Sequence, residues 1–400
     1  MKRFRMNVLM VLDEEFPPDI RVENEAEALI KDGHSVTLAC YTRKKLTEKE
    51  TYKGIDIVRF PITDLLYKLK ALSLSVPYYF NFWYKNLNLI LQKNRFDVIH
   101  IHDLPLIKPG LKLSRKFNIQ LVADYHENRP EIMKMYKHVK TFPGNILISL
   151  KAWQKYQKEI TPEVDKLILV TNEAKDFYVD EYGLKRDKIF VVPNYADVKK
   201  SINVKIDKSI INKYKNKFAL VYFGDTGFRR GTLNIIEAAK ALKKNNKIQF
   251  IIIGTSKEQY LLENEVKNHN LNNVLLTGYL PYEKAASYIA ASKAGLCPFL
   301  RNIHHDTTYA KKMFQYMAFR KPVIVSDCTA QTNVVKKYRC GAVYKAGNSH
   351  ELVDRIIQIM NNQIYQQLSD NAYQAVQQDL KAENANKELI KLYNSFEIKA

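Results

Sequence analysis

Residues 304–327 combine a polar loop, a lysine and an apolar run in an order that suits anion binding. The loop begins with His304 and His305 and leads into a predicted helix whose first turn carries Lys312. Free backbone N–H groups and the helix dipole at such a terminus add to the charge of a lysine ammonium. The spacing therefore indicates a phosphate site, and the alternative is an exposed lysine on an amphipathic helix.

A second basic segment, rich in glycine, lies between a predicted strand and a predicted helix at residues 222–231. Gly224 and Gly227 allow a ligand close to the backbone because glycine has no Cβ atom. Arg230, at the entrance of the helix, could bind a diphosphate through two parallel hydrogen bonds. The glycines do not fit the GxGxxG dinucleotide fingerprint, so this segment alone indicates an anion contact but not a particular ligand.

Both segments belong to a pattern of strands that alternate with helices, which is typical of parallel sheets covered by helices on both faces. In the first half of the chain, apolar runs predict strands at 7–12, 35–40, 97–102, 120–124, 166–170 and 188–192. The pattern then restarts and predicts strands at 218–223, 248–253, 274–277, 294–297 and 322–326. We expect two consecutive doubly wound α/β domains that face each other across a ligand cleft.

The composition is that of a globular chain with an excess of positive charge. Its 400 residues include 63 Lys and Arg against 42 Asp and Glu, a formal net charge of +21. Four cysteines without a CxxC pair argue against a disulfide framework or a zinc site and predict a reducing compartment. The opening residues lack a signal peptide's apolar core, and the apolar run at 72–83 is too short to span a bilayer. We expect a cytoplasmic chain, soluble or at a membrane surface.

Short motifs follow one another in a fixed order along nearly the whole chain. The first half contains Phe16-Pro-Pro-Asp-Ile-Arg21, Asp97-Val-Ile-His-Ile-His102-Asp103, Asp124-Tyr-His126-Glu127 and Val191-Val-Pro193-Asn194. The second half contains Tyr222-Phe-Gly224, Arg230-Gly231 and Lys312-Met-Phe-Gln315-Tyr-Met-Ala. In this order the motifs resemble the glycosyltransferase 4 family of GT-B glycosyltransferases, which use nucleotide-activated sugars.

The resemblance implies a division of the chain into three parts. Residues 1–195 would form an acceptor-side Rossmann-like domain, and residues 196–378 would form the facing nucleotide-sugar donor domain. Residues 379–400 would form a C-terminal helix that crosses back to the N-terminal domain.

The resemblance also implies a role for each matching residue. Arg230 and Lys312 would bind the donor diphosphate and stabilise the charge on the leaving nucleotide, and His126 would lie beside the transferred sugar. These three are the expected catalytic residues. The other expected donor contacts are Gly224, Gly254, Tyr279, Leu280, Thr307 and Gln315. The expected acceptor-side residues are Pro18 with the loop around it from Phe16, and Arg21, Asp103 and Glu127.

The implied reaction moves a hexose-type sugar from a nucleotide-diphosphate sugar to a glycan or lipid-linked acceptor, with retention of anomeric configuration. Such transfers build surface polysaccharides or glycoconjugates. The sequence shows no cluster of metal ligands, and basic residues would supply the charge stabilisation that a metal gives elsewhere. We therefore expect no cofactor and no metal. We also expect no nucleic-acid partner, because no recognised binding module is present.

Three positions depart from the family pattern. The family usually carries two glutamates eight positions apart on the donor side, and this chain has Thr307 and Gln315 there. Gln315 can still hydrogen-bond a ribose, and Asp306 could replace the missing carboxylate. Asp225 stands where the family commonly has an arginine. Two other interpretations therefore stay open, namely a nucleotide-sugar epimerase or hydrolase on the same fold, and a non-catalytic partner protein that has lost donor binding.

Much of the positive charge lies in residues 65–160, which contain 16 Lys and Arg against 6 Asp and Glu, or +10 of the total. Aromatic and aliphatic residues are interleaved with these lysines, a composition that suits docking on anionic lipid. The alternative is that the aromatic residues belong to the core. The sequence thus leaves open a peripheral contact with the inner face of the cell membrane.

Several histidines have expected places. Of His100 and His102, which alternate on one predicted strand, we expect one to pack and the other to face the cleft. His34 follows a glycine at a helix–strand corner and is expected to be structural. His304 and His305 are either donor-sugar contacts or exposed loop residues.

Overall fold

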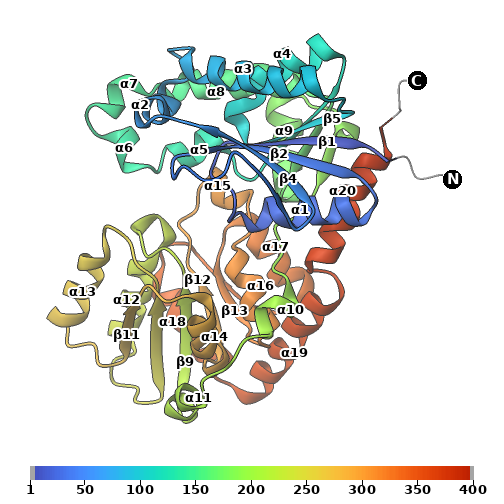
Figure 1. Cartoon of the computed structure of the whole chain (residues 1–400). Helices are drawn as coiled ribbons and strands as arrows, with labels where there is room; N and C mark the ends of the chain where they lie inside the picture. Colours follow the sequence, from blue (N-terminus) through green and yellow to red (C-terminus); the bar gives the residue numbers. More distant parts are fainter. Residues whose placement is uncertain (1–4, 397–400) are drawn as a thin grey trace. The chain divides into compact units, whose positions relative to one another are not determined.

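The computed structural model describes residues 5–396 and divides the chain into two compact units (Figure 1). Unit 1 comprises the chain up to Pro193 together with residues from Ala385 onward, and unit 2 runs from Asn194 to Asn384. The boundaries thus fall at residues 193 and 384, where the sequence suggested 195 and 378. The last helix, α20 (Ala382–Asn394), begins in unit 2 and then belongs to unit 1.

Unit 1 contains an eight-stranded sheet with the order β3-β4-β2-β1-β5-β6-β7-β8, in which every neighbouring pair is parallel except β3 with β4. The strands are β1 (Asn7–Leu12), β2 (Ser35–Thr42), β3 (Lys49–Tyr52), β4 (Ile55–Pro61), β5 (Val98–His102), β6 (Gln120–Tyr125), β7 (Lys166–Leu169) and β8 (Ile189–Val191). The order reverses between β1 and β5. Open α/β sheets bind ligands at the carboxyl ends of the strands at such a switch point.

The helices of unit 1 are α1 (Ile20–Lys31), α2 (Asp64–Lys68), α3 (Tyr78–Lys93), α4 (Ile107–Phe117), α5 (Arg129–Met133), α6 (Lys137–Lys140), α7 (Gly144–Leu147), α8 (Leu150–Ile160) and α9 (Asn172–Tyr182). Short 3-10 turns are η1 (Leu69–Leu72), η2 (Leu104–Leu106), η3 (Thr161–Glu163) and η4 (Arg186–Lys188). Asp19 caps α1 by accepting the amides of Arg21 and Val22. The aromatic residues of α3 mostly belong to the core, since Tyr79 and Trp83 are fully buried.

Unit 2 contains a six-stranded parallel sheet with the order β11-β10-β9-β12-β13-β14. The strands are β9 (Phe218–Phe223), β10 (Ile248–Ile253), β11 (Val274–Gly278), β12 (Ala294–Cys297), β13 (Val323–Ser326) and β14 (Gly341–Tyr344). This is the doubly wound order of nucleotide-binding sheets, and it reverses between β9 and β12. The predicted fold class, two doubly wound α/β domains with a C-terminal helix returning to the first, is confirmed.

The helices of unit 2 are α10 (Val198–Ile202), α11 (Lys208–Tyr214), η5 (Phe228–Arg230), α12 (Thr232–Ala241), α13 (Gln259–Asn268), α14 (Tyr282–Ala291), α15 (Ile303–Asp306), α16 (Lys311–Ala318), α17 (Thr329–Tyr338), α18 (Ser349–Ile359) and α19 (Asn362–Gln378). Helix α16 packs tightly on the sheet at the switch point. Tyr316 lies so close to β12 that a Cβ atom on Gly295 would come within 2.0 Å of its ring. Its hydroxyl also accepts the amide of Phe223, at the end of β9, at 2.8 Å.

Among residues 5–396, no helix combines the length and apolar character that crossing a bilayer requires.

Candidate functional site

Arg230 and Lys312, far apart in the sequence, come together at the β9–β12 switch point of unit 2. The Lys312 ammonium lies 3.7 Å from the centre of the Tyr222 ring and 5.6 Å from that of Phe299. The Arg230 guanidinium lies 5.1 Å from the same Phe299 ring. Tyr222 belongs to β9 and Phe299 lies two residues after the end of β12, so both cations lie where a doubly wound sheet binds its ligand. We call these four residues the anion site.

Two glycines let the backbone close around the anion site. Gly224 has a φ of +128°, and a Cβ atom there would lie 3.0 Å from the Lys312 ammonium. Gly254 has a φ of +135°. A Cβ atom at this position would lie only 1.8 Å from the carbonyl oxygen of Gly224, so the absence of a side chain lets the two backbone segments pack together. A side chain at residue 254 would therefore push apart the ends of β9 and β10, and one at residue 224 would crowd the Lys312 ammonium.

Burial tunes the charge of Lys312. Removal from water, helped by the nearby charge of Arg230, lowers the pKa of Lys312 to about 7. Its surroundings are aromatic rings, which stabilise a cation much less than water does. A negative charge placed beside the ammonium would favour its protonated form and raise this pKa again.

Asp225, which stands where the family commonly has an arginine, anchors the arginines beside it. Its carboxylate accepts the Gly227 amide at 2.9 Å and Arg229 at 2.8 Å, and lies 3.7 Å from Nε of Arg230. Burial alone would raise the pKa of Asp225, but the Gly227 amide and the Arg229 charge lower it below its usual value. Asp225 thus stays ionised and orients the cations.

The other residues expected to bind the donor differ from one another in burial and in contacts. Thr307 is buried and donates its hydroxyl to the Ile303 carbonyl at 2.7 Å, inside its own turn. Asp306 accepts the amide of Thr329 at 2.8 Å, which ties it to α17. Gln315 is half-buried on α16, Leu280 is half-buried against the core and Tyr279 is exposed.

His304 and His305 are buried rather than exposed, which corrects one of the two expectations for them. The His305 ring stacks on Phe299 with the ring centres 4.6 Å apart. Among the residues that the structure describes, His304 Nδ1 and His305 Nε2 have no hydrogen-bond partner. Burial, followed by neighbouring positive charge, lowers their pKa values to about 3 and about 4. Both imidazole rings are therefore uncharged at neutral pH and lie beside the anion site.

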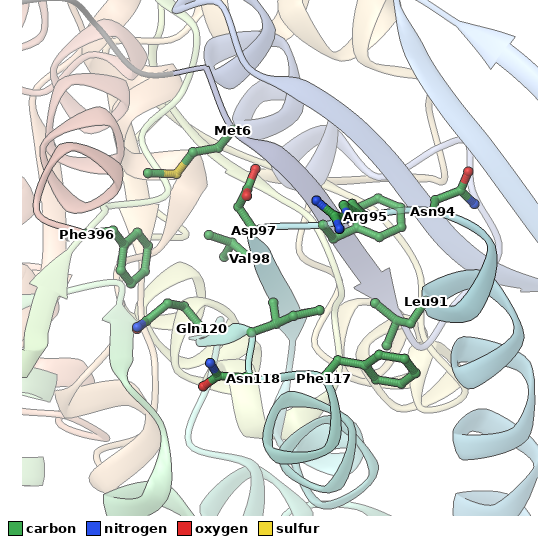
Figure 2. A pocket seen from close by; sticks show the side chains of 12 residues that line it. Met6, Leu91, Asn94, Arg95, Asp97, Val98, Phe117, Asn118, Gln120 and Phe396 are labelled. Atoms are coloured by element: carbon green, nitrogen blue, oxygen red, sulfur yellow. The ribbon is translucent and has the colours of Figure 1, made fainter. Parts of the chain in front are cut away.

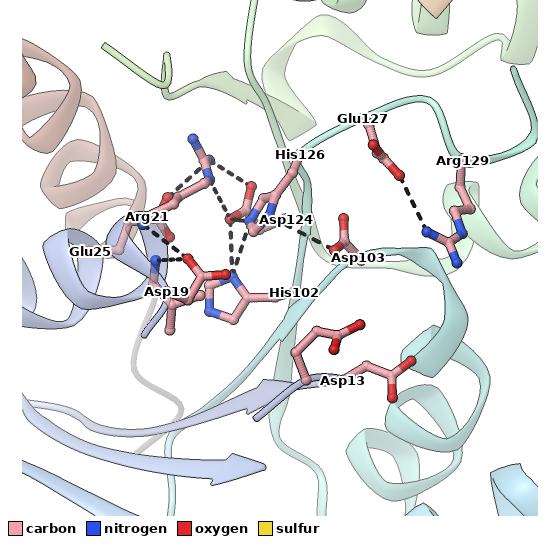
Figure 3. A network of polar contacts seen from close by, with 12 residues as sticks. Asp13, Asp19, Arg21, Glu25, His102, Asp103, Asp124, His126, Glu127 and Arg129 are labelled. Atoms are coloured by element: carbon pink, nitrogen blue, oxygen red, sulfur yellow. Dashed lines mark hydrogen bonds and ion pairs between the residues drawn. The ribbon is translucent and has the colours of Figure 1, made fainter. Parts of the chain in front are cut away.

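Unit 1 contains a buried polar network around Asp124, shown in Figure 3. Arg21 donates to both oxygens of Asp124, at 2.8 and 3.2 Å, and also pairs with Glu25 at 2.9 Å. The same carboxylate lies 2.8 Å from Nε2 of His126 and 3.2 Å from Nδ1 of His102. Asp124 therefore orients three basic side chains from α1, β5 and the end of β6.

The network keeps His126 charged. Burial alone would lower its pKa, but the carboxylates of Asp124 and Asp103, the latter 3.8 Å from Nδ1, raise it to about 9. In turn, Arg21 and His126 overcome the burial of Asp124 and hold its pKa well below the usual range. His126 is thus an imidazolium at neutral pH, which can donate hydrogen bonds but cannot accept a proton.

The structure corrects three expectations on this side of the chain. Arg21 does not face a ligand, because it is buried and bonds to Asp124, Glu25 and the Val192 carbonyl. Phe16 is fully buried, and only Pro18 of its loop is exposed. Neither histidine of β5 faces outward, since His100 and His102 are both fully buried.

His100 instead ties the C-terminal helix to the sheet of unit 1. Its Nδ1 lies 2.8 Å from the hydroxyl of Tyr393, on α20. His34, expected to be structural, is buried, its Nδ1 accepts the amide of Met6 at 3.2 Å and its ring packs on Tyr393.

The network also gathers four potential metal ligands that the sequence did not reveal, namely Glu25, His100, His102 and Asp124. These side chains come from α1, β5 and β6, so no short spacing in the sequence announces them. The guanidinium of Arg21 already binds Glu25 and Asp124, and it supplies the positive charge that a metal ion would bring. We therefore interpret the cluster as the group of side chains that binds the buried Arg21 guanidinium, and not as a metal site.

Charged residues line the carboxyl ends of β1, β5 and β6, as Figure 3 shows. After β5 and β6, Asp103 and Glu127 are half-exposed, and Glu127 pairs with Arg129 at 3.3 Å. Burial, followed by the charge of Asp103, raises the pKa of Glu127. After β1, Asp13 pairs with Lys70 at 3.2 Å. Asp13, Lys70 and Arg129 were missed in the sequence, although the end of the first strand marks the place of Asp13.

A cavity of about 400 Å³ opens at this edge of the unit 1 sheet. Glu14, Pro105 and Arg129 place it at the ends of β1, β5 and β6, and Tyr67 and Trp153 add aromatic walls. We call it the strand-end pocket. Its mixture of rings and charges suits a ligand with both polar and apolar parts.

A second cavity, of about 460 Å³, lies at the opposite edge of the same sheet (Figure 2). Met6, Asp97 and Gln120 line it at the amino ends of β1, β5 and β6, and Phe396 faces it from the C-terminal segment. Doubly wound sheets bind their ligands at the carboxyl edge, so the strand-end pocket is the candidate site of unit 1.

Two family models together match most of the chain. Residues 20–200 match the model described as Glycosyltransferase Family 4, and residues 203–375 match Glycosyl transferases group 1. The chain belongs to the glycosyltransferase 4 family. The resemblance of its motifs to that family is thereby confirmed.

Two relatives of this glycosyltransferase share between a fifth and a quarter of their aligned residues with it. An uncharacterized glycosyltransferase of Methanocaldococcus jannaschii is 23% identical over 239 residues, which cover 59% of this chain and 60% of that protein. The UDP-Gal:alpha-D-GlcNAc-diphosphoundecaprenol alpha-1,3-galactosyltransferase of Escherichia coli is 21% identical over 302 residues, 70% of this chain and 71% of that protein.

Solved structures share the GT-B fold. HepE of Anabaena, solved in complex with UDP, has a TM-score of 0.73 to this glycosyltransferase at 16% identity, and the match covers 98% of this chain and all of that one.

Proposed function

We propose that this glycosyltransferase moves a sugar, of the hexosyl type, from a nucleotide-diphosphate sugar to a glycan or lipid-linked acceptor, with retention of anomeric configuration. The observation that carries the proposal is the meeting of Arg230 and Lys312 at the switch point of the unit 2 sheet, over the rings of Tyr222 and Phe299. Two cations at one sheet edge match the two charges of a bound diphosphate.

In the proposed mechanism the anion site stabilises the leaving nucleotide. As the bond from the sugar to the diphosphate breaks, negative charge grows on the phosphate oxygen. Arg230 and the protonated form of Lys312 offset that charge in a setting with little water, where removal of one such donor typically costs about 10²–10³ in rate. Because these cations meet the charge, the reaction is proposed to need no metal and no other cofactor.

The proposed role of His126 is to donate a hydrogen bond to the transferred sugar. Its imidazolium, held between Asp124 and Asp103, has no free lone pair and so cannot remove the acceptor's proton. We assign that proton to an oxygen of the leaving phosphate, which gains charge at the same moment. Asp124 and Arg21 act through His126 as positioning residues.

The acceptor is proposed to enter the strand-end pocket of unit 1, where Asp103 and Glu127 offer carboxylates to its hydroxyl groups. HepE was solved with UDP, and the Escherichia coli relative acts on a diphosphoundecaprenol-linked sugar. These two names support a UDP-type donor and a lipid-linked acceptor, as in surface polysaccharide or glycoconjugate synthesis. Such a reaction would take place in the cytoplasm, at the inner face of the cell membrane.

Calorimetry with UDP and with GDP tests donor binding, and a turnover assay without acceptor tests the reaction class. Binding of one nucleotide, without breakdown of its sugar nucleotide until an acceptor is added, supports the transferase. Turnover without acceptor would instead favour an epimerase or hydrolase. Binding of neither nucleotide would favour the non-catalytic partner protein that Thr307 and Gln315 leave open. Transfer that persists in a chelator would support the metal-independent mechanism.

A further inference from the structure

Four large apolar side chains are exposed together at one end of unit 1. Leu65 on α2 is 71% exposed, and Phe142, Ile146 and Leu147, in or just before α7, are 79%, 72% and 49% exposed. The strand-end pocket connects them, because α2, α6 and the residue that follows α7 all contribute to its wall. Figure 1 shows α2, α6 and α7 gathered at this end of the unit. We call the four residues the apolar rim.

Lysines outnumber acids around the apolar rim, and Asp64, the acid next to Leu65, is paired with Arg43 at 2.9 Å. Residues 132–158 contain six lysines and no aspartate or glutamate. Lys137 and Lys140 precede the rim, Lys151 follows it, and all three are exposed. Lys68, one turn after Leu65, is exposed as well. Apolar groups beside exposed lysines are the pairing that binds the interface of an anionic bilayer.

The charge also argues against a second copy of this chain as the partner. A symmetric dimer would place the same surface on both sides, so the lysines of one rim would face those of the other. Such repulsion is absent when the opposite surface is negatively charged lipid.

We propose that the apolar rim docks this protein on an anionic bilayer, with Phe142, Ile146, Leu147 and Leu65 at the boundary between head groups and acyl chains. Lys68, Lys137, Lys140 and Lys151 then contact the anionic head groups. Docking there places the strand-end pocket against the membrane, so that a lipid-linked acceptor enters it directly from the bilayer. This consequence for acceptor delivery rests on the proposed function, whereas the docking itself does not.

Vesicle co-sedimentation without donor or acceptor tests the docking. The wild type is expected to bind vesicles that mix phosphatidylglycerol with phosphatidylcholine, to lose binding as salt rises, and not to bind phosphatidylcholine alone. Replacing Lys137, Lys140 and Lys151 by Gln should weaken binding about a hundredfold, since each lysine near an anionic surface contributes about fivefold. Replacing Phe142, Ile146 and Leu147 by Ser should weaken it at least about tenfold.

A control variant changes exposed residues of the same types in unit 2. Ile357 is 53% exposed, and Ile357→Ser combined with Lys336→Gln and Lys337→Gln should leave vesicle binding unchanged. All rim variants should keep the melting temperature of the wild type, read by circular dichroism, which shows that unit 1, where the substitutions lie, still folds. If nucleotide binds but anionic vesicles do not, the docking inference fails while the proposed function stands. Dimerisation through the rim, abolished by the Ser variants, would likewise overturn it.

A site-specific label gives an independent measurement. The four native cysteines are buried, so a maleimide dye should react selectively with Ile146→Cys or with the control Ile357→Cys. The dye at residue 146 is expected to shift to the blue on addition of anionic vesicles, and the dye at residue 357 is not. Equal shifts at both positions would contradict docking through the rim.

Discussion

The pKa of Lys312 predicts that the nucleotide is bound together with a proton. In the free protein burial lowers this pKa to about 7, so at pH 8 only about a tenth of the Lys312 side chains carry the proton. A diphosphate beside the ammonium favours its charged form. Binding at pH 8 should therefore take up about 0.9 proton, and the affinity should fall about tenfold for each pH unit above 7.

Calorimetry with UDP in buffers of different ionisation enthalpy measures this uptake, because the observed heat then varies with the number of protons exchanged. At pH 8 the terminal phosphate of UDP is already ionised, since its second pKa is about 6, and it contributes little. His304 and His305, near the anion site, stay neutral because burial keeps their pKa values at about 3 and about 4. Lys312 is then the group that gains the proton.

Lys312→Arg is the matched control, because an arginine stays protonated throughout and should bind UDP without proton uptake. A wild-type uptake near zero at pH 8 would mean that the diphosphate does not contact Lys312, and would refute this reasoning. The same uptake in wild type and Lys312→Arg would assign the proton to another group.

Three further outcomes follow from the contacts. Arg230→Ala should lower the rate of transfer at least about a hundredfold, while the melting temperature, read by circular dichroism, stays unchanged. A near-normal rate would show that Arg230 does not contact the diphosphate. With saturating donor, so that the loss of affinity through Lys312 does not limit the rate, transfer should fall as pH rises through about 9, where His126 loses its proton. Asp103→Asn should move that fall to lower pH, and an unmoved pH profile would contradict the pairing of Asp103 with His126. Gly295→Ala should destabilise the fold by about 1–3 kcal/mol in urea unfolding, because its methyl group would strike the Tyr316 ring, and an unchanged midpoint would show that α16 can shift.

The sheets were predictable because each central strand is a short apolar run between turn residues. The runs at 218–223, 248–253 and 294–297 match β9, β10 and β12 residue for residue. Strands β3 and β4 escaped notice since they form a hairpin at the edge of the sheet, where β3 has no buried residue. Helix α3 was missed because its lysine and asparagine residues obscure the buried stripe that contains Tyr79 and Trp83.

The candidate site was predictable where a motif ties a residue to the end of a strand or the start of a helix. His126 directly follows β6, and Lys312 lies in the first turn of α16. Arg21 was assigned to the wrong surroundings, because nothing in α1 shows that its partner Asp124 lies on β6. The low pKa of Lys312 likewise depends on the rings of Tyr222 and Phe299, which the fold brings together from β9 and from the segment after β12.

The central claim is that Arg230 and Lys312 hold the donor diphosphate at the β9–β12 switch point. A crystal structure with bound UDP tests it most directly. The account predicts diphosphate oxygens within about 2.7–3.2 Å of the Arg230 guanidinium and the Lys312 ammonium. A diphosphate bound away from both side chains would contradict it.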